Sequence, residues 1–346
     1  MRVSMEHAGD LALEPIACPI CGHAGASTLA LMPDFGMGVP GRFPLARCGS
    51  CGLLYQNPRV REDQLERMYP AHYRAHARDP ELGRLVGHLD DGDRWFLAAR
   101  LGYAHLGPAR VGASAAVRAW ARGAKLATVF PPWTGAGRLL DVGCGSGHFL
   151  RRMALVGWRV AGVEFDAEAA ARARTVAPLL FEGDPADADF APGSFDVVTS
   201  FHVVEHLPRP RAALANMLSW LAPGGLMIVE VPNAGGVGAH VFGGYWSGYD
   251  YPRHLTHFTP ETMTALVERA GGRVERVQHR TKPRYLIRSL ENLLAGRPGA
   301  LARAGRAAIR SRAGRGAAKL ALEVALPLAR PARMGEVARY FIRRAH

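Results

Sequence analysis

The residues best suited to chemistry lie in a short glycine-rich segment near the middle of the chain. Gly143, Gly145 and Gly147 alternate directly after an apolar run that contains Asp141. Glycine lets a backbone turn tightly and approach a ligand closely, and a helix N-terminus attracts anionic, nucleotide-like groups. The pattern therefore predicts a strand, a tight turn and a helix from His148, with a nucleotide-like ligand over the turn.

Two further acids follow the next apolar runs. Val160 to Val163 is followed by Glu164, and the short run from Phe181 to Gly183 is followed by Asp184. A carboxylate only accepts hydrogen bonds, which suits the vicinal hydroxyls of a ribose, so we expect Glu164 to bind one. Dinucleotide-binding folds use a similar glycine loop, but their spacing is Gly-x-Gly-x-x-Gly, whereas here it is Gly-x-Gly-x-Gly.

The elements that must position these residues alternate between strands and helices. Helices are predicted over 148–156, 167–176, 209–221 and 260–270, with strands between them, including Ser194 to Phe201 and Leu226 to Val231. Such alternation predicts an α/β fold with a parallel sheet and helices on both faces. The acids and the glycine loop would then share the carboxyl edge of that sheet.

These motifs resemble the class I S-adenosylmethionine-dependent methyltransferases. Within them the chain is similar to the bacterial group with an N-terminal zinc ribbon that is tied to sugar and polysaccharide methylation. The resemblance covers Arg138 to Gly272, with Ile16 to Pro58 as an accessory module. It implies a Rossmann-like fold with a mostly parallel seven-stranded sheet, and S-adenosylmethionine as the cofactor.

The resemblance also implies roles for the donor-site residues. In the family, the position of Asp141 and the glycine loop hold the methionine moiety, the position of Glu164 binds ribose, and that of Asp184 faces the adenine amine. The alternative is that these residues only form turns of the fold. The complete set that we expect at the donor is Asp141, Gly143, Cys144, Gly145, Glu164, Phe165, Asp184, Phe201 and His202.

Four of the five cysteines form two Cys-x-x-Cys pairs, each followed by glycine. Four thiolates at this spacing match a tetrahedral zinc site, and a site with four protein ligands is structural rather than catalytic. In a cytoplasmic chain, disulfides are the poorer interpretation, and metal-free or redox cysteines are the other alternative. The sugar C-methyltransferases that the chain resembles also carry an N-terminal zinc module. The predicted ligands are Cys18, Cys21, Cys48 and Cys51.

Length and composition predict one large domain with small additions. The 346 residues are 48% hydrophobic, which is ample for a core. No apolar run reaches 18 residues and no signal segment is recognised at the N-terminus, so a cytoplasmic protein is expected. The predicted parts are a zinc ribbon over 16–58, a helical linker or lid over 59–136, a methyltransferase core over 137–281, and a basic helical insertion or tail over 282–346. Within the linker we expect a helix from Val60 to Tyr73. Within the last part, Val337 to Ile342 is expected to form the last strand of the sheet.

Most of the excess positive charge lies in the last segment. The net charge is +13, and the residues from Thr281 to His346 carry 15 Lys and Arg against 3 Glu, or +12. An anionic partner is one explanation, and ordinary solvated surface helices are another. Leu320, Val324 and Leu328 repeat every four residues beside basic groups, which would suit peripheral contact with an anionic membrane that carries a lipid-linked substrate. Nucleic acid is the less favoured partner.

The first candidate for acceptor chemistry follows the fourth predicted strand. His202, Glu205 and His206 resemble the Glu-x-x-Glu-His element of ubiquinone-pathway O-methyltransferases, which holds a divalent metal. Here histidine replaces the first glutamate of that element. We therefore favour a structural role, in which Glu205 and His206 cap the loop and helix that follow.

The second candidate is an aromatic, glycine-rich loop over 242–251 that follows the fifth strand. Aromatic faces and flexible glycines suit a sugar or another ring. The end of the loop is similar to the Tyr-x-Glu-His element of sugar C-methyltransferases: Tyr251 and His254 match it, and Arg253 replaces the glutamate. This exchange removes a carboxylate base and supplies a cation that could hold phosphate, so we expect O-methylation with His254 as general base. In the alternative, His254 and His257 only tie the loop to the core.

The leading hypothesis is a methyltransferase that acts on a hydroxyl, or a carbon, of a glycan, nucleotide sugar or lipid-linked saccharide, with Tyr251, Arg253 and His254 at the acceptor. A nucleic-acid methyltransferase that uses the ribbon and the basic tail is the second hypothesis. Against it, the Asn/Asp-Pro-Pro-aromatic motif of amino-group methylation is absent after the fourth strand. A third hypothesis is a non-catalytic binding protein that uses the fold as a scaffold.

Overall fold

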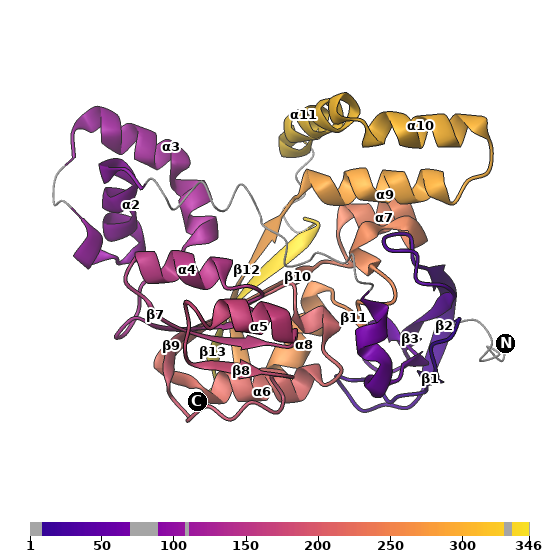
Figure 1. Ribbon diagram of the computed structural model, residues 1–346, viewed down its shortest axis with the longest axis horizontal. Helices are drawn as coiled ribbons and strands as arrows, with labels where there is room; N and C mark the ends of the chain where they lie inside the picture. Colours follow the sequence, from indigo (N-terminus) through magenta and orange to yellow (C-terminus); the bar gives the residue numbers. More distant parts are fainter. Residues whose placement is uncertain (1–8, 70–88, 108–110, 329–333, 346) are drawn as a thin grey trace. The chain divides into compact units, whose positions relative to one another are not determined.

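The structure is a computed structural model, and it describes residues 9–69, 89–107, 111–328 and 334–345 (Figure 1). The chain forms two compact units that interleave along the sequence. The first consists of Met1–Tyr73, His202–Arg211 and Glu230–Tyr340, and the second of Arg74–Phe201, Ala212–Val229 and Phe341–His346. The glycine-rich loop therefore belongs to the second unit, and both the cysteines and the aromatic loop belong to the first.

A seven-stranded sheet has the order β12-β13-β10-β9-β6-β7-β8. Strand β6 pairs in parallel with both β7 and β9, so that Leu139 lies opposite Val160 on one side and Val197 on the other. Strand β8 pairs in parallel with β7. The predicted α/β fold with a mostly parallel seven-stranded sheet is confirmed. The strands are β6 (Arg138–Val142), β7 (Arg159–Glu164), β8 (Leu180–Glu182), β9 (Phe195–Phe201), β10 (Leu221–Pro232), β12 (Gly272–Arg280) and β13 (Val337–Arg344).

The helices that alternate with these strands lie close to their predicted positions. They are α4 (His148–Leu155), α5 (Ala167–Ala173), α6 (Pro210–Ser219) and α8 (Pro260–Arg269). The Thr259 hydroxyl accepts the N–H of Thr262, and the Thr262 hydroxyl accepts the N–H of Thr259. This capping box fixes the start of α8 with Pro260 in its first turn.

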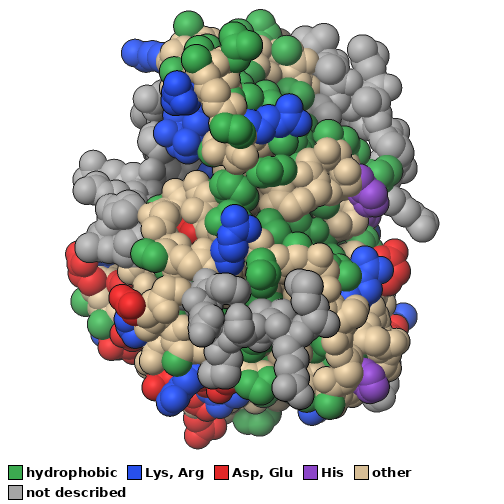
Figure 2. Space-filling model, turned by 90° about the vertical axis from the view of Figure 1, so that its right-hand side faces the viewer, with side chains coloured by type: hydrophobic (Ala, Val, Ile, Leu, Met, Phe, Trp, Pro, Cys, Tyr) green, Lys and Arg blue, Asp and Glu red, His purple; other side chains and the backbone are tan. Residues whose placement is uncertain are grey.

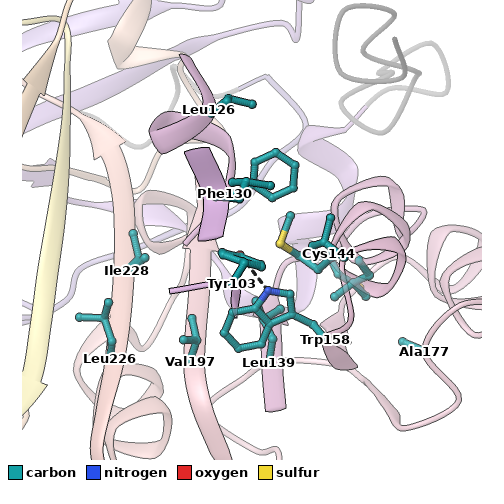
Figure 3. Close-up of a cluster of buried hydrophobic side chains, with 14 of the residues drawn as sticks. Tyr103, Leu126, Phe130, Leu139, Cys144, Trp158, Ala177, Val197, Leu226 and Ile228 are labelled. Carbon is teal, nitrogen blue, oxygen red and sulfur yellow. Dashed lines mark hydrogen bonds between the residues drawn. The ribbon is translucent and has the colours of Figure 1, made fainter. Parts of the chain in front are cut away.

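The core of the second unit packs α2 (Asp91–Leu101) and α3 (Ala113–Val129) with residues of β6, β9 and α4. Figure 3 shows Tyr103, Phe130 and Trp158 in this core. The Trp158 indole N–H donates to the Tyr103 hydroxyl at 2.9 Å, and that hydroxyl donates to the Pro131 carbonyl at 2.8 Å. Both buried polar groups are therefore satisfied, which lets these large rings fill the core without a desolvation penalty.

The first unit contains a four-stranded sheet of order β11-β4-β3-β2. Strand β11 lies about 200 residues further along the chain than its neighbour β4. Thr256 pairs with Tyr55, and the Gln56 side-chain amide donates to the carbonyls of Pro252 and His254 at 2.6 and 3.0 Å. The N-terminal segment thus forms part of the support for the residues that follow the aromatic loop. The strands are β2 (Ala26–Pro33), β3 (Arg42–Cys48), β4 (Leu54–Gln56) and β11 (Thr256–His257), and a separate pair joins β1 (Leu13–Glu14) to β5 (Arg59–Val60).

The remaining helices of the first unit are α7 (Val237–Phe242), α9 (Pro283–Ala295), α10 (Ala300–Arg310) and α11 (Arg312–Leu328). Helices α10 and α11 pack on α9 (Figure 1). Single-turn 3-10 helices cover Gly243–Tyr245 and Ser247–Tyr249 in the aromatic loop, and Val204–His206 before it. Within the described residues, no helix is long and apolar enough to cross a bilayer.

The helix predicted from Val60 to Tyr73 is present in part, as a shorter helix of the 3-10 type. Glu62–Met68 forms a 3-10 helix, and the N–H groups of Gln64 and Tyr69 bond to the carbonyls three residues earlier. Val60 is held in the β1–β5 pair, so only a short segment is left to turn, and short turns favour the tighter helix. The end of the predicted helix, from residue 70, lies outside the described residues.

Candidate functional site

The glycine loop connects β6 to α4 in the conformation that its sequence requires. Gly143, Gly145 and Gly147 have φ angles of 76°, 55° and 79°, a region that residues with a side chain rarely adopt. The N–H groups of Gly143 and Cys144 both donate to the carbonyl of Val163, at 2.8 and 3.1 Å. The loop is therefore tied to the end of β7, where Glu164 follows.

The carboxylate of Glu164 is held by backbone groups on both sides. One oxygen accepts the N–H of Gly145 at 2.6 Å, and the other accepts the N–H groups of Phe165 and Asp166 at 3.0 Å each. The residue is 4% exposed. These hydrogen bonds fix the orientation of the carboxylate, and its oxygens keep lone pairs that could accept ribose hydroxyls.

Asp141 is a buried carboxyl group at the end of β6. Burial, together with the charge of Glu164, raises its pKa to about 7, while the Thr199 hydroxyl that donates to it at 2.7 Å acts in the opposite direction. Sequence reasoning missed Thr199. The signal for it was the register of β6 and β9, which places Thr199 directly opposite Asp141.

The other predicted donor residues take varied positions. The Cys144 side chain is buried against Gly162, where an added Cβ would lie only 2.8 Å from its sulfur. Phe165, which precedes the N-cap residue of α5, is 54% exposed, and Phe201 packs edge-on against Phe149 with ring centroids 5.4 Å apart. The Asp184 carboxylate accepts the N–H of Ala186 at 2.7 Å, which closes a local turn. All of these residues belong to the second unit, whereas His202 belongs to the first.

The aromatic loop lines a pocket within the first unit. Trp246, Tyr249 and Tyr251 contribute rings from the loop, and Phe35 contributes one from the end of β2. The cavity volume is only about 20 Å³, so the pocket would have to widen to admit a sugar ring. Its polar groups are Asp34, Ser247, Asp250, Arg288 and Asn292. A few polar groups among aromatic walls are typical of small-molecule sites.

Arg253 does not lie free at this pocket. Its guanidinium is fully buried and binds Asp34 through both terminal nitrogens, at 2.7 and 2.9 Å. It also binds Asp250 at 2.9 and 3.1 Å and donates to the carbonyls of Met68 and Tyr251. With these donors committed, Arg253 has none left for a phosphate, and its contacts join the aromatic loop to the N-terminal segment.

His254 has a tautomer that the structure defines. Its Nδ1 lies 2.8 Å from the Gly248 carbonyl, and because a carbonyl only accepts, Nδ1 carries the proton. The Nε2 lone pair therefore remains available to accept a proton when the ring is neutral. Nε2 lies 4.0 Å from a carboxylate oxygen of Glu205 and 4.0 Å from one of Asp250, which also lines the pocket.

Glu205, His206 and His254 bring one carboxylate and two imidazoles together, with one ligand atom of each within 4.8 Å of the others. No N–H or O–H group of the described residues completes a well-aligned hydrogen bond to either Glu205 oxygen. Burial opposes ionisation of Glu205, but the imidazoles of His202, His254 and His206 lower its pKa overall. This donor set could hold a divalent cation, which would occupy the Nε2 lone pair of His254 if it used that atom.

Tyr251 and His257 form a buried pair rather than facing solvent. The Tyr251 hydroxyl lies 2.9 Å from Nε2 of His257. Burial raises the pKa of Tyr251 well above 10 and lowers that of His257 well below 6.5, so both groups stay neutral near pH 7. The pair stabilises the base of the loop, while one side of Tyr251 lines the pocket.

The neighbours of His202, like the contact of Thr199 with Asp141, were not evident from the sequence. It has a φ angle of 60°, which is unusual for a residue with a side chain and often marks a functional position. Its Nε2 lies 3.1 Å from Nζ of Lys282 and 3.3 Å from Glu230, whose carboxylate also binds Arg280 and Arg339. Burial lowers the pKa of Lys282 to about 8 against the opposing effect of Glu230.

The four cysteines of the two Cys-x-x-Cys pairs have sulfur atoms within 4.8 Å of one another, and none forms a disulfide. The Sγ atoms of Cys18 and Cys51 are 3.5 Å apart, as are those of Cys21 and Cys48. A tetrahedron with Zn–S bonds of about 2.3 Å has edges of about 3.8 Å, so this arrangement fits a zinc ion. Gly22 and Gly52, both with positive φ, close the two turns by donating to the carbonyls of Cys18 and Cys48.

Comparison with known proteins agrees with this geometry. Residues 114–277 match the family described as "Methyltransferase domain". A probable S-adenosylmethionine-dependent methyltransferase of Mycolicibacterium smegmatis is 32% identical over 146 residues, which are 40% of this chain and 54% of that protein. A ubiquinone biosynthesis O-methyltransferase of Cereibacter sphaeroides is 34% identical over 151 residues, 39% of this chain and 59% of that protein. The chain thus spans little more than half the length of these curated relatives.

Among solved structures, a SAM-dependent methyltransferase from Archaeoglobus fulgidus matches 63% of this chain and 91% of its own, at 20% identity and a TM-score of 0.43. A score this low carries no argument, so the assignment of the fold rests on the strand order of the chain itself and on the family match.

Proposed function

We propose that this chain, an enzyme whose residues 114–277 form a class I S-adenosylmethionine-dependent methyltransferase domain, methylates a hydroxyl of a glycan, nucleotide sugar or lipid-linked saccharide. The observation that carries the donor half of this proposal is the anchoring of Glu164. Three backbone N–H groups, one of them from the glycine loop, hold its carboxylate at the end of β7.

The residues around the glycine loop fit S-adenosylmethionine, which supplies an electrophilic methyl group when bound. Glu164 would accept the ribose hydroxyls, and Asp141 would face the cationic methionine moiety. The glycines let the backbone approach the ligand without interference from side chains. Asp184 would lie at the adenine, as in the family that the sequence resembles.

The acceptor half rests on the pocket of the first unit. Three of its rings come from the aromatic loop, and rings beside carboxylate and amide groups suit a saccharide, which has apolar C–H faces and many hydroxyls. Arg288 is exposed at this pocket and could pair with a phosphate of a nucleotide sugar or lipid-linked acceptor. It takes the phosphate-binding role that Arg253 cannot fill.

His254 is the residue that we propose as general base. The Gly248 carbonyl holds the proton on Nδ1, so Nε2 can take the proton of the acceptor hydroxyl. Glu205, buried 4.0 Å away, would stabilise the imidazolium that results. Methyl transfer is otherwise a matter of alignment, so one base and a shaped pocket suffice.

The relatives favour oxygen as the accepting atom. Several are named ubiquinone biosynthesis O-methyltransferases, which makes a ring hydroxyl of a quinone-type acceptor the second candidate for this chain. We also propose that Cys18, Cys21, Cys48 and Cys51 hold a structural zinc ion. Zinc would stabilise the strands that support the residues after the aromatic loop.

The first experiment is calorimetric binding of S-adenosylhomocysteine to the zinc-loaded protein and to the Glu164→Gln variant. Glu168→Gln, which alters an exposed carboxylate on α5, is the matched control. We expect binding by the wild type and the control, and a loss of at least about tenfold in Glu164→Gln, because the amide can no longer accept the same set of hydrogen bonds. Equal affinities in all three proteins would refute the donor site.

The second experiment supplies radiolabelled S-adenosylmethionine with saccharide, catechol and RNA acceptors in parallel. Label in the saccharide supports the proposed acceptor, whereas label in the catechol supports the quinone-type alternative. Label in RNA alone would overturn both and favour a nucleic-acid methyltransferase.

A further inference from the structure

Helices α10 and α11 present a surface that the proposed reaction does not use. We call it the α10–α11 face, and its defining residues are Leu301, Arg303, Arg312 and Leu320. Leu301 is 90% exposed and Leu320 is 64% exposed, and no residue of α10 is buried. Single exposed leucines are common on protein surfaces, so these two are informative only together with the charge of the same helices.

The α10–α11 face is held on α9 by specific contacts. Glu291 of α9 pairs with Arg310 at 3.3 Å and with Arg315 at 3.6 Å. Leu294 of α9 lies against Gly305, where an added Cβ would be 3.6 Å from the leucine side chain. Beside these contacts, Leu301 and Leu320 remain largely exposed within the described residues.

Basic residues predominate in this segment. Residues 283–322 contain nine Lys and Arg but only one acid, Glu291. The Glu291 side chain is 10% exposed and already binds two arginines. Figure 2 shows Lys, Arg and hydrophobic side chains intermixed at the top of the view, over these helices. The surface therefore offers positive charge and apolar side chains together.

We propose that the α10–α11 face docks on an anionic phospholipid membrane. Basic residues are attracted to anionic headgroups, and leucines beside them gain from burial at the boundary between headgroups and acyl chains. Single-stranded nucleic acid would instead call for aromatic side chains on which bases stack, and residues 296–322 contain no aromatic residue and no histidine. The combination of charge and leucine thus fits a bilayer surface better than a phosphate backbone.

This inference deepens the proposed function and rests on it in one respect: docking would bring the enzyme to a lipid-linked acceptor. Of the repeat predicted at Leu320, Val324 and Leu328, only the Leu320 side chain lies among the described ones. The docking surface accordingly consists of α10 and the first part of α11.

The experiment is co-sedimentation of the full chain with two kinds of vesicle. One is pure phosphatidylcholine, and the other is three parts phosphatidylcholine to one part phosphatidylglycerol. We expect at least about tenfold tighter binding to the anionic vesicles, and weaker binding when NaCl is raised from about 0.1 M to about 0.5 M.

Two double variants test the two components of the surface. Leu301→Ser with Leu320→Ser removes the apolar part, and Arg303→Gln with Arg312→Gln removes two charges. Each should weaken binding to the anionic vesicles by about tenfold. The matched controls change exposed residues of the same types elsewhere: Leu155→Ser on α4, and Arg94→Gln with Arg118→Gln on α2 and α3. Both controls should bind like the wild type.

Equal binding to both kinds of vesicle, or equal losses in variants and controls, would overturn the inference. So would tighter binding to a single-stranded RNA that is lost in the charge variant but kept in the leucine variant, because that pattern assigns the surface to nucleic acid. S-adenosylhomocysteine binding is measured on the same samples. Vesicle binding without it would refute the proposed function alone, and the reverse result would refute membrane docking alone.

Discussion

Replacing Asp141 with asparagine should stabilise the ligand-free protein at neutral and alkaline pH. Asp141 is 4% exposed, and burial raises its pKa from an ordinary 3.8 to about 7. Each unit of pKa difference between the folded and unfolded states corresponds to about 1.4 kcal/mol. The folded state therefore loses about 4 kcal/mol when this group has to be ionised. An asparagine side chain is neutral, and its amide oxygen can still accept the hydrogen bond from the Thr199 hydroxyl.

The sign of the pH dependence follows from the direction of the shift. Because the pKa of Asp141 is higher in the folded state, the folded state binds more protons than the unfolded state between about pH 4 and pH 7. The stability that this group contributes is fully present below about pH 4 and declines by about 1.4 kcal/mol per pH unit until about pH 7. The Asp141→Asn variant should thus equal the wild type near pH 4 and exceed it by about 4 kcal/mol at pH 8.

The assay is urea unfolding at several pH values between 5 and 8, followed by the fluorescence of tryptophans such as Trp158 in the same unit. Asp189→Asn, at an exposed position of that unit, is the matched control and should show no pH-dependent difference from the wild type. A difference between Asp141→Asn and the wild type that stays constant over this pH range would refute the reasoning. A wild type that is the more stable protein at pH 8 would refute it equally.

Three further changes test other parts of the structure. His254→Gln should lower kcat by about 10²- to 10⁴-fold in a methyl-transfer assay, and an unchanged rate would exclude His254 as the base, while calorimetry should find donor affinity intact. Arg253→Met should lower the free energy of unfolding in urea by about 3–5 kcal/mol, because Asp34 and Asp250 lose their buried partner; a loss under about 1 kcal/mol would contradict this. Elemental analysis should find about one zinc per chain, and none in Cys48→Ser; full zinc content in that variant would rule out the four-cysteine site.

The donor loop was predictable because its signals are local. Glycines at alternate positions, an acid before them and a helix pattern after them all lie within a dozen residues. Such a segment has few ways to fold, so Gly143, Gly145 and the start of α4 are where the sequence places them. The Thr199 bond to Asp141 was not predictable in this way, because it depends on the register of two strands 58 residues apart.

The contacts of the proposed acceptor residues could not be predicted from the sequence, because they join segments that lie far apart along the chain. The type and position of Arg253 suggested a phosphate ligand. Nothing near it in the sequence indicated that Asp34, 219 residues away, would bind its guanidinium. The N-terminal segment and the aromatic loop also meet through the four-stranded sheet, in which strand β11 is two residues long. A strand of that length leaves almost no pattern in a sequence.

The pairing of strand β11 with β4 limits which segments of the chain can be exchanged by recombination. The family match begins at residue 114, yet residues 54–56 pair with Thr256 and His257, and Gln56 holds the backbone of Pro252 and His254. A recombination event that exchanged the N-terminal segment alone would separate the proposed base from its support. The cysteine-containing segment and the acceptor loop are therefore expected to pass between lineages as one piece.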